Sequence, residues 1–157
     1  MTRLKDALKK FLHREEGTQM FEFAIVLPAL VLLMGGTVEL GRLFYQYTTL
    51  AKGTRAAARY LSTVPNVATS TDAAKRIVLC GNPNTCGDAN NPIILPNLNA
   101  NNIVVTPPPA AGTAQVRYVT VSITGYNYRY VAFNLNRLTG GTLNLSLSPA
   151  TTMRYMR

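Results

Sequence analysis

The sequence lacks most of the side chains from which catalytic sites are built. Trp is absent, His occurs once, as His13, and only seven of the 157 residues are acidic. General acid–base chemistry needs a titratable group within reach of a partner. No nucleophile–base arrangement and no glycine-rich phosphate loop can be read from this chain. We therefore expect a protein that is not an enzyme and that holds no cofactor.

Charge is also scarce, and most of it has one sign. Charged residues make up 15% of the chain, and 16 Lys and Arg against 7 acids give a net charge of +9. Soluble domains carry about 25% charged residues, so the deficit is typical of a membrane segment or a packed assembly surface. The positive excess suits nucleic acid, anionic lipid or an acidic protein, and its even spread does not choose among them.

Residues 18–38 form a long apolar segment in which Glu22 is the single charge. A helix of this length spans roughly 30 Å, the thickness of a bilayer core. A buried core helix is the alternative, but it would sit at the end of a chain with little else to bury it. We predict a transmembrane helix here, behind a polar leader at 1–17 whose basic residues favour a cytoplasmic N-terminus. Four basic residues that follow the span weaken this assignment of sides: Arg42, Lys52, Arg55 and Arg59.

The segment 39–63 is predicted to continue the helix in amphipathic form. Apolar or small residues recur at three- and four-residue steps and are expected to pack on a globular head: Leu40, Leu43, Phe44, Tyr47, Leu50, Ala51, Thr54, Ala57, Ala58 and Leu61. A second, polar stripe contains the four basic residues together with Gln46 and Thr49. We expect one helix from Thr18 to Thr63, stopped near Pro65 and kinked or loosened at Pro28 and at Gly35–Gly36.

Residues 64–157 are predicted to form the head. A short helix is expected at 70–79, with Ser70, Thr71 or Asp72 as its cap, followed by a loop at 80–101. Alternating apolar residues predict strands at 103–106, 116–123, 126–130 and 143–147, with a bulge or turn at Gly125. The predicted fold class is therefore α+β, with a long N-terminal helix packed on a small antiparallel sheet.

Two further features of the head have more than one interpretation. Cys80 and Cys86 favour a disulfide if the head lies outside the cytoplasm, with free thiols or a metal site as alternatives. Alternating tyrosines and nearby arginines are compatible with nucleic-acid or carbohydrate binding: Tyr126, Tyr128, Tyr130, Arg117 and Arg129. One half-buried strand face explains these tyrosines more simply, so we do not expect nucleic-acid binding.

The order of the N-terminal segments carries the functional prediction. An ordinary secretory signal places its cleavage site after the apolar core. Here a polar leader ends in Gly17, the apolar run follows, and Glu22 and Phe23 lie at its start. This arrangement resembles the processing site of type IV pilins and of their Tad/Flp branch. The resemblance implies cleavage between Gly17 and Thr18 by a prepilin peptidase, with Glu22 as the fifth mature residue.

The resemblance extends well beyond the cleavage site. Residues 15–62 are similar to TadE-like proteins in the glutamate–aromatic pair, Pro28, the Glu39–Arg42 segment and the alanine-rich Arg55–Tyr60 segment. Residues 151–155 are also similar to that family's C-terminus. The family implies a pilin-like fold and an accessory subunit that initiates, primes or caps a tight-adherence pilus used for adhesion and biofilm formation.

The acidic residues of the helix have roles that can be argued from charge. A carboxylate in lipid is costly, so the new amine of Thr18, in the same or a neighbouring subunit, is expected to neutralise Glu22. The alternative is that Glu22 is solvated at the interface. Glu39 and Arg42 lie three residues apart on one helix face, which fits either an ion pair within the helix or a contact between subunits.

The resemblance also implies partners and a location. The partners would be a prepilin peptidase, other TadE- or TadF-like minor pilins, the major Flp pilin and the inner-membrane assembly platform. The chain would cross the bacterial inner membrane once, with a periplasmic head, and enter an extracellular pilus. The competing hypothesis is a signal-anchored periplasmic binding domain that is never cut at Gly17 and never enters a filament.

Overall fold

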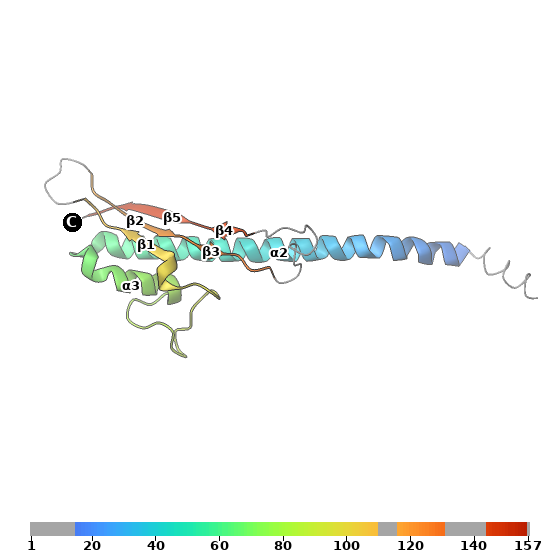
Figure 1. The fold of residues 1–157 in the computed structure, drawn as a ribbon, viewed down its shortest axis with the longest axis horizontal. Coiled ribbons are helices and arrows are strands. Elements are labelled where there is room, and N and C mark those ends of the chain that lie inside the picture. Colours follow the sequence, from blue (N-terminus) through green and yellow to red (C-terminus); the bar gives the residue numbers. More distant parts are fainter. Residues whose placement is uncertain (1–14, 110–115, 131–143, 157) are drawn as a thin grey trace, which may run out of the picture. The chain divides into compact units, whose positions relative to one another are not determined.

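The structure is a computed structural model that describes residues 15–109, 116–130 and 144–156 (Figure 1), with the backbone alone described at 15–18. It divides into two compact units, and the division falls between Leu40 and Gly41. Each unit is described separately below. The predicted leader at 1–17 lies almost wholly outside the described residues.

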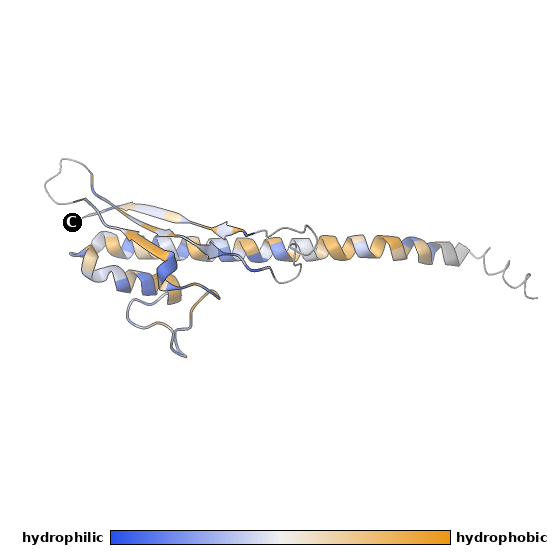
Figure 2. Ribbon diagram, in the orientation of Figure 1, coloured by the Kyte–Doolittle hydropathy of each residue, from blue (hydrophilic) through white to orange (hydrophobic). Residues whose placement is uncertain are grey.

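The first unit consists of the N-terminal part of helix α2, which is assigned from Glu15 to Thr63. The predicted end at Thr63 is confirmed, whereas the predicted start at Thr18 is three residues late. The apolar pattern begins after Gly17, but the polar residues before it also adopt helical geometry. The helix assignment continues through Pro28. Figure 2 shows that apolar residues dominate this part of α2.

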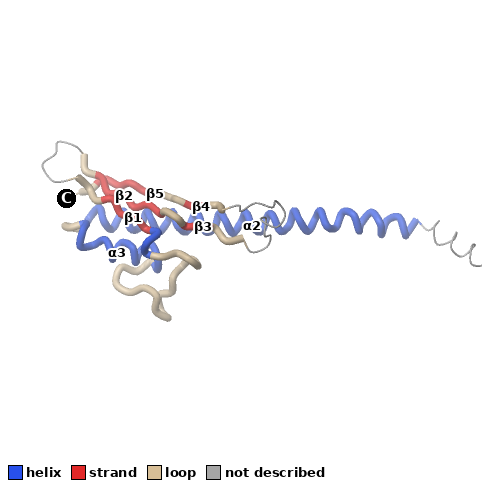
Figure 3. Tube along the Cα trace, viewed as in Figure 1, coloured by secondary structure: helices blue, strands red, loops and turns tan. Residues whose placement is uncertain are grey.

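The second unit joins the rest of α2 to a second helix and two small sheets (Figure 3). Helix α3 runs from Val67 to Cys80, and a short 3-10 helix, η1, from Ala100 to Asn102. The strands are β1 (Ile103–Thr106), β2 (Tyr118–Ile123), β3 (Tyr126–Asn127), β4 (Ser146–Leu147) and β5 (Ala150–Arg154). One sheet has the order β1-β2-β5, the other pairs β3 with β4, and all pairings are antiparallel. The predicted α+β class is confirmed.

The two sheets are consecutive parts of one two-stranded ribbon. β2 leads into β3 and β4 into β5, so the same two chain segments pair on both sides of an interruption. Gly125, with φ of 69°, lies in that interruption, where a bulge or turn was predicted. The amide of Ile123 donates to the carbonyl of Pro149 at 3.0 Å, and the amide of Tyr128 donates to Leu145 at 2.8 Å. The ribbon therefore bends without separating.

The strand predictions are uneven in accuracy. The strand at 103–106 is confirmed residue for residue, and β2 begins two residues later than predicted. The strands predicted at 126–130 and 143–147 are two residues long in each case, and Leu145 is exposed; Leu143 lies outside the described residues. Alternation of residue types shows which side chains face inward. A strand also needs hydrogen bonds to a partner strand in register, and the interruption of the ribbon near Gly125 limits that pairing.

Helix α3 starts earlier than predicted, and its predicted caps are wrong. The side chain of Asn66 is the N-cap and accepts a hydrogen bond from the amide of Ala68 at 3.0 Å. The hydroxyl of Thr71 instead donates to the carbonyl of Val67 at 3.0 Å, an interaction made inside a helix. At the other end Gly81 adopts φ of 75° and its amide donates to Ile77 at 2.9 Å.

The predicted apolar stripe of 39–63 is correct at Leu43 and from Leu50 onward, and wrong at three positions of its first half. Leu50, Ala57 and Leu61 are buried against the sheet residues Val119, Val121 and Ile123, which have no exposed surface. By contrast Leu40, Phe44 and Tyr47 are exposed, and Gln46 is buried. The helix faces the head with the side that carries Gln46, Leu50 and Thr54, because partners in the head satisfy the two polar side chains.

Contacts at Gly53 and at its C-terminal end help to hold α2 within the second unit. Gly53 allows a close approach to α3, since a Cβ added there would lie 3.3 Å from the carbonyl oxygen of Val78. Near the end of α2, the hydroxyl of Tyr155 donates to Val64 at 2.7 Å and the amide of Met156 donates to Ser62 at 3.1 Å. The residues that follow β5 are therefore attached to the end of α2.

Candidate processing and assembly site

The predicted processing residues lie near the start of the described part of α2. The helix is assigned from Glu15, so Gly17 and Thr18 are the third and fourth residues of that assignment. Their backbone is helical and continuous with the apolar segment that follows them.

Glu22 and Phe23 follow within the next turn, in an exposed apolar environment. Glu22 is exposed, and so are the large side chains beside it, Phe21 at 68% and Phe23 at 62%. The most apolar 18-residue window of this helix has a mean hydropathy of 2.1, and 6% of it is buried. A core helix of a globular protein would be mostly buried, so this exposure is consistent with a single membrane span.

Glu39 and Arg42 lie in different environments, although they are three residues apart. Glu39 has 7% of its surface exposed and does take part in a polar interaction, while Arg42 is exposed. A buried acid is unusual unless it is paired or hydrogen-bonded. An ion pair or a contact between subunits at these two residues stays a prediction.

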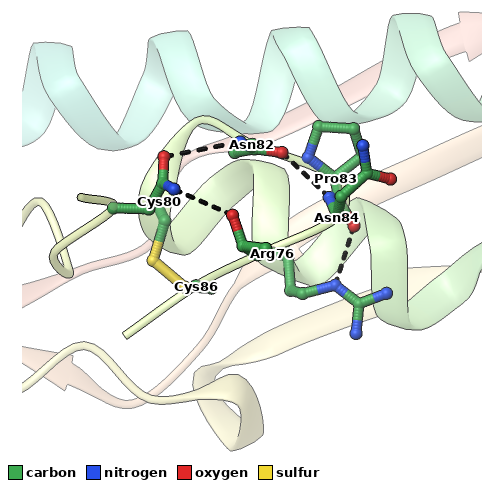
Figure 4. Close-up of a disulfide and its surroundings, with 8 residues drawn as sticks. Arg76, Cys80, Asn82, Pro83, Asn84 and Cys86 are labelled. Atoms are coloured by element: carbon green, nitrogen blue, oxygen red, sulfur yellow. Dashed lines mark hydrogen bonds between the residues drawn. A yellow bond between two sulfur atoms is a disulfide. The ribbon is translucent and has the colours of Figure 1, made fainter. Parts of the chain in front are cut away.

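Cys80 and Cys86 are joined in a disulfide, as predicted, with their Cα atoms 5.5 Å apart. The bridge connects the last residue of α3 to the loop that follows it (Figure 4). From α3, the Nε of Arg76 donates to the carbonyl of Pro83 in this loop at 2.7 Å, and within the loop the amide of Asn84 donates to the Asn82 side chain at 2.9 Å. The disulfide and these hydrogen bonds together fix an otherwise irregular segment.

The predicted residues are divided between the two units. Gly17, Thr18, Glu22 and Phe23 share two turns of α2, while the cysteines belong to the second unit. A cavity of about 200 Å³ in the second unit is lined by none of them; its walls include Asn66, Pro107, Arg117 and Tyr155. In the described ranges, no three His, Cys, Asp or Glu side chains are grouped as a metal site would need.

A buried polar contact that was not predicted joins α2 to the ribbon. The hydroxyl of Tyr126 donates to the side-chain oxygen of Gln46 at 3.1 Å, and burial raises the pKa of this tyrosine. Thr54 and Thr151 are similarly joined through their hydroxyls at 3.0 Å. A three- and four-residue spacing that admits polar residues would have found this face of the second unit: Leu43, Gln46, Leu50, Thr54, Ala57 and Leu61.

The tyrosines of the ribbon belong to the interior, as the simpler interpretation predicted. Tyr126 and Tyr128 are buried, and the ring of Tyr128 meets that of Tyr130 edge to face at 5.3 Å. The guanidinium of Arg117 lies 4.8 Å from the centre of the Tyr155 ring. The two buried rings therefore do not form an exposed stacking surface of the kind that single-stranded nucleic acid needs.

Comparison with known proteins identifies one segment. Residues 17–59 match the family model described as TadE-like protein. No curated protein and no solved structure matches the chain. The matched segment contains Glu22, Phe23, Glu39 and Arg42, and its first residue is Gly17. Over residues 17–59, therefore, this chain is similar to TadE-like proteins.

Proposed function

We propose that this chain is a minor pilin of a tight-adherence pilus, made as an inner-membrane prepilin and cut between Gly17 and Thr18. One observation carries the proposal: the TadE-like match begins at Gly17, the residue at which the polar leader gives way to the apolar helix. A peptidase that cuts before a membrane span leaves that span on the mature protein. The mature subunit therefore keeps its anchor.

The membrane topology follows from the same order. Residues 18–38 span the membrane, 1–17 lie in the cytoplasm, and the head at 64–157 lies in the periplasm on the helix 39–63. The exposed apolar side chains of the N-terminal part of α2 support a span. The disulfide between Cys80 and Cys86 supports an oxidising compartment for the head, since disulfides are rare in the cytosol.

Glu22 supplies a reason for subunits to associate. Cleavage after Gly17 creates a positive amine on Thr18, and Glu22 is the single charge of the segment 18–38. A carboxylate in lipid costs roughly 2.5–3.5 kcal/mol at mid-span on insertion scales, and less near an end. Pairing with the amine of a neighbouring subunit removes part of that cost and favours assembly over a lone helix.

The role is structural, and the partners are other proteins of the same machine. The chain is a substrate of a prepilin peptidase and associates with TadE- or TadF-like minor pilins, the major Flp pilin and the inner-membrane platform. Its role is to initiate, prime or cap the filament that the cell uses for adhesion. The proposal rests on the TadE-like segment at 17–59.

The mature N-terminus tests the proposal directly. Membranes from cells that express the full chain are analysed by intact mass and N-terminal peptide mapping, for the natural chain and for Gly17→Ala. Gly36→Ala is the matched control, because it makes the same change in the same helix at a position where an added Cβ meets nothing within 4 Å. We expect a start at Thr18 in the natural chain and the control, and an uncut chain in Gly17→Ala.

An uncut natural chain would sink the pilin proposal and leave the signal-anchored periplasmic domain. The role of Glu22 is tested separately with Glu22→Gln, which keeps the shape of the side chain and removes its charge. We expect normal cleavage but loss of pilus assembly. If Glu22→Gln assembles pili at the natural level, the proposed pairing of the amine with the carboxylate is refuted, and the cleavage result still stands.

A further inference from the structure

Exposed apolar side chains of α2 continue beyond Val38, the predicted end of the membrane span. Four large side chains in the next turns are exposed to between 45% and 65% of their surface: Leu40, Phe44, Tyr45 and Tyr47. Contiguous apolar surface of this kind marks an interaction site on a protein. Its occupant has to be identified from the surrounding chemistry.

The exposed side chains surround the part of the helix that the head leaves uncovered. Gln46 and Leu50 are buried on the opposite side, and Leu43 packs against the core. At about 100° per residue, Phe44 and Tyr45 point in clearly different directions. A single partner helix contacts one stripe of a helix, whereas a lipid layer contacts every uncovered direction. The distribution favours lipid.

The aromatic residues have a spacing that matches a bilayer. Phe21 and Phe23 lie at one end of the apolar segment, and no Phe, Tyr or Trp occurs again until Phe44. The interval from Phe23 to Phe44 is about 21 residues, or roughly 30 Å of helix. Aromatic side chains collect at the two surfaces of a membrane, and its hydrocarbon core is about 30 Å thick.

The charged residues in this interval fit the same placement. Glu39 is buried at 7% exposure and so does not present its carboxylate to the exposed surface. Arg42 is exposed, and a long basic side chain can extend to the headgroups while its stem stays in an apolar layer. The segment 39–43 therefore offers aliphatic surface and one cation to its surroundings.

We propose that the outer surface of the membrane lies at Phe44–Tyr47, with these aromatic rings in the lipid headgroup layer, rather than at Val38. The proposal rests on the membrane residence proposed above. It assigns the first turns of the second unit to the headgroup layer and makes lipid the partner of this face. The lipid-facing part of α2 then runs from Phe21 to Tyr47.

Fluorescence quenching measures this depth, because the chain contains no Trp and one substitution introduces the sole indole. The full chain carrying Phe44→Trp is reconstituted into vesicles of phosphatidylethanolamine and phosphatidylglycerol. The lipids carry a nitroxide quencher either near the headgroup or deep in the acyl chain. Leu33→Trp is the control for the membrane interior and Tyr118→Trp, on β2, the control for water; both positions are exposed.

We expect the shallow quencher to reduce Phe44→Trp emission at least twofold more than the deep one, with the opposite order for Leu33→Trp. Tyr118→Trp should respond to aqueous acrylamide alone. Tyr45→Trp repeats the test at a second exposed ring and should match Phe44→Trp.

Three outcomes would overturn the proposal. If acrylamide quenches the emission of Phe44→Trp and neither lipid quencher does, the membrane surface lies near Val38 and not at Phe44–Tyr47. Protection from all quenchers that disappears when the vesicles hold less protein would assign the face to a second copy. If neither lipid quencher reduces the emission of Leu33→Trp, the membrane span itself is refuted. The proposed membrane function then fails as well, whatever Phe44→Trp shows.

Discussion

The hydroxyl of Tyr126 lies 3.1 Å from the side-chain oxygen of Gln46, across 80 residues of sequence. It also donates to the carbonyl of Pro96 at 3.2 Å. This contact joins the ribbon, the loop before η1 and helix α2 inside the second unit. A polar residue thus occupies a helix position that would otherwise hold an aliphatic side chain, and it does so because its partner is in place.

Removal of one partner from this pair should cost more than removal of both. Tyr126→Phe leaves the oxygen of Gln46 buried without its donor, which we expect to lower the free energy of unfolding by about 1–3 kcal/mol. Gln46→Leu combined with Tyr126→Phe should cost less than the sum of the two single changes. Denaturant unfolding of the full chain in detergent micelles measures the cycle. Tyr118→Phe, at an exposed ring, should change stability by less than about 0.5 kcal/mol, and strict additivity would contradict the coupling.

The same tyrosine should make the head sensitive to alkali. Burial raises the pKa of Tyr126 above its ordinary value of 10.0, so the folded state holds this proton more tightly than the unfolded state. The contribution of Tyr126 to the free energy of unfolding is therefore fully present below pH 10.0. It is lost as the pH rises through the higher pKa of the folded state. Denaturation midpoints measured from pH 8 to about 11 test this. Tyr126→Phe should show a shallower fall, and equal slopes would refute the assignment.

Gly53 should not tolerate a branched side chain, whereas Gly41 should. A Cβ at Gly53 would lie 3.3 Å from the carbonyl oxygen of Val78, while a Cβ at Gly41 would meet nothing within 4 Å. We expect Gly53→Val to cost about 1–3 kcal/mol through displacement of α3. Gly41→Val should be neutral or slightly stabilising, since valine forms helix better than glycine. Both are measured by denaturation, and equal effects would show that the approach of the two helices is not limiting.

Loss of the disulfide should loosen one loop and lower stability by a limited amount. Cys80→Ala with Cys86→Ala removes a small ring, which on the chain-entropy model stabilises the fold by about 2 kcal/mol. Without the bridge, one hydrogen bond from Arg76 on α3 to the carbonyl of Pro83 still holds this loop, and we expect the loop to become a site of proteolysis. Limited digestion followed by mass analysis checks this, with reductant on the natural chain as the matched comparison. An unchanged digestion pattern would show that Arg76 and the asparagines hold the loop without the bridge.

Structural features that depend on neighbouring residues could be predicted from the sequence, whereas features that depend on distant partners could not. The strand at 103–106 ends at Pro107, and β2 alternates between buried and half-buried or exposed residues, so both could be read from neighbouring residues. The extent of β3 and β4 could not, because each strand pairs with a segment about 20 residues away across an interruption. The burial of Gln46 was missed for a similar reason, since its polarity suggests solvent until Tyr126 is placed beside it.

The candidate site was more accessible to sequence reasoning than the head was. The order of leader, Gly17, Glu22 and apolar helix is linear information, and the family match over 17–59 falls on it. Phe44 and Tyr47, which are exposed, were predicted to pack on the head, because a three- and four-residue spacing cannot show which side of a helix faces a head. That side was decided by partners in the ribbon, which lie more than 70 residues further along the chain.

The attachment of Tyr155 and Met156 to the end of α2 sets the order in which the head can form during synthesis. Tyr155 bonds to the carbonyls of Val64 and Pro65, residues that the ribosome has made 91 and 90 positions earlier. Until β5 emerges, β2 has one of its two edges open and the end of α2 has no clamp. The head therefore cannot be completed before its last strand has been translated.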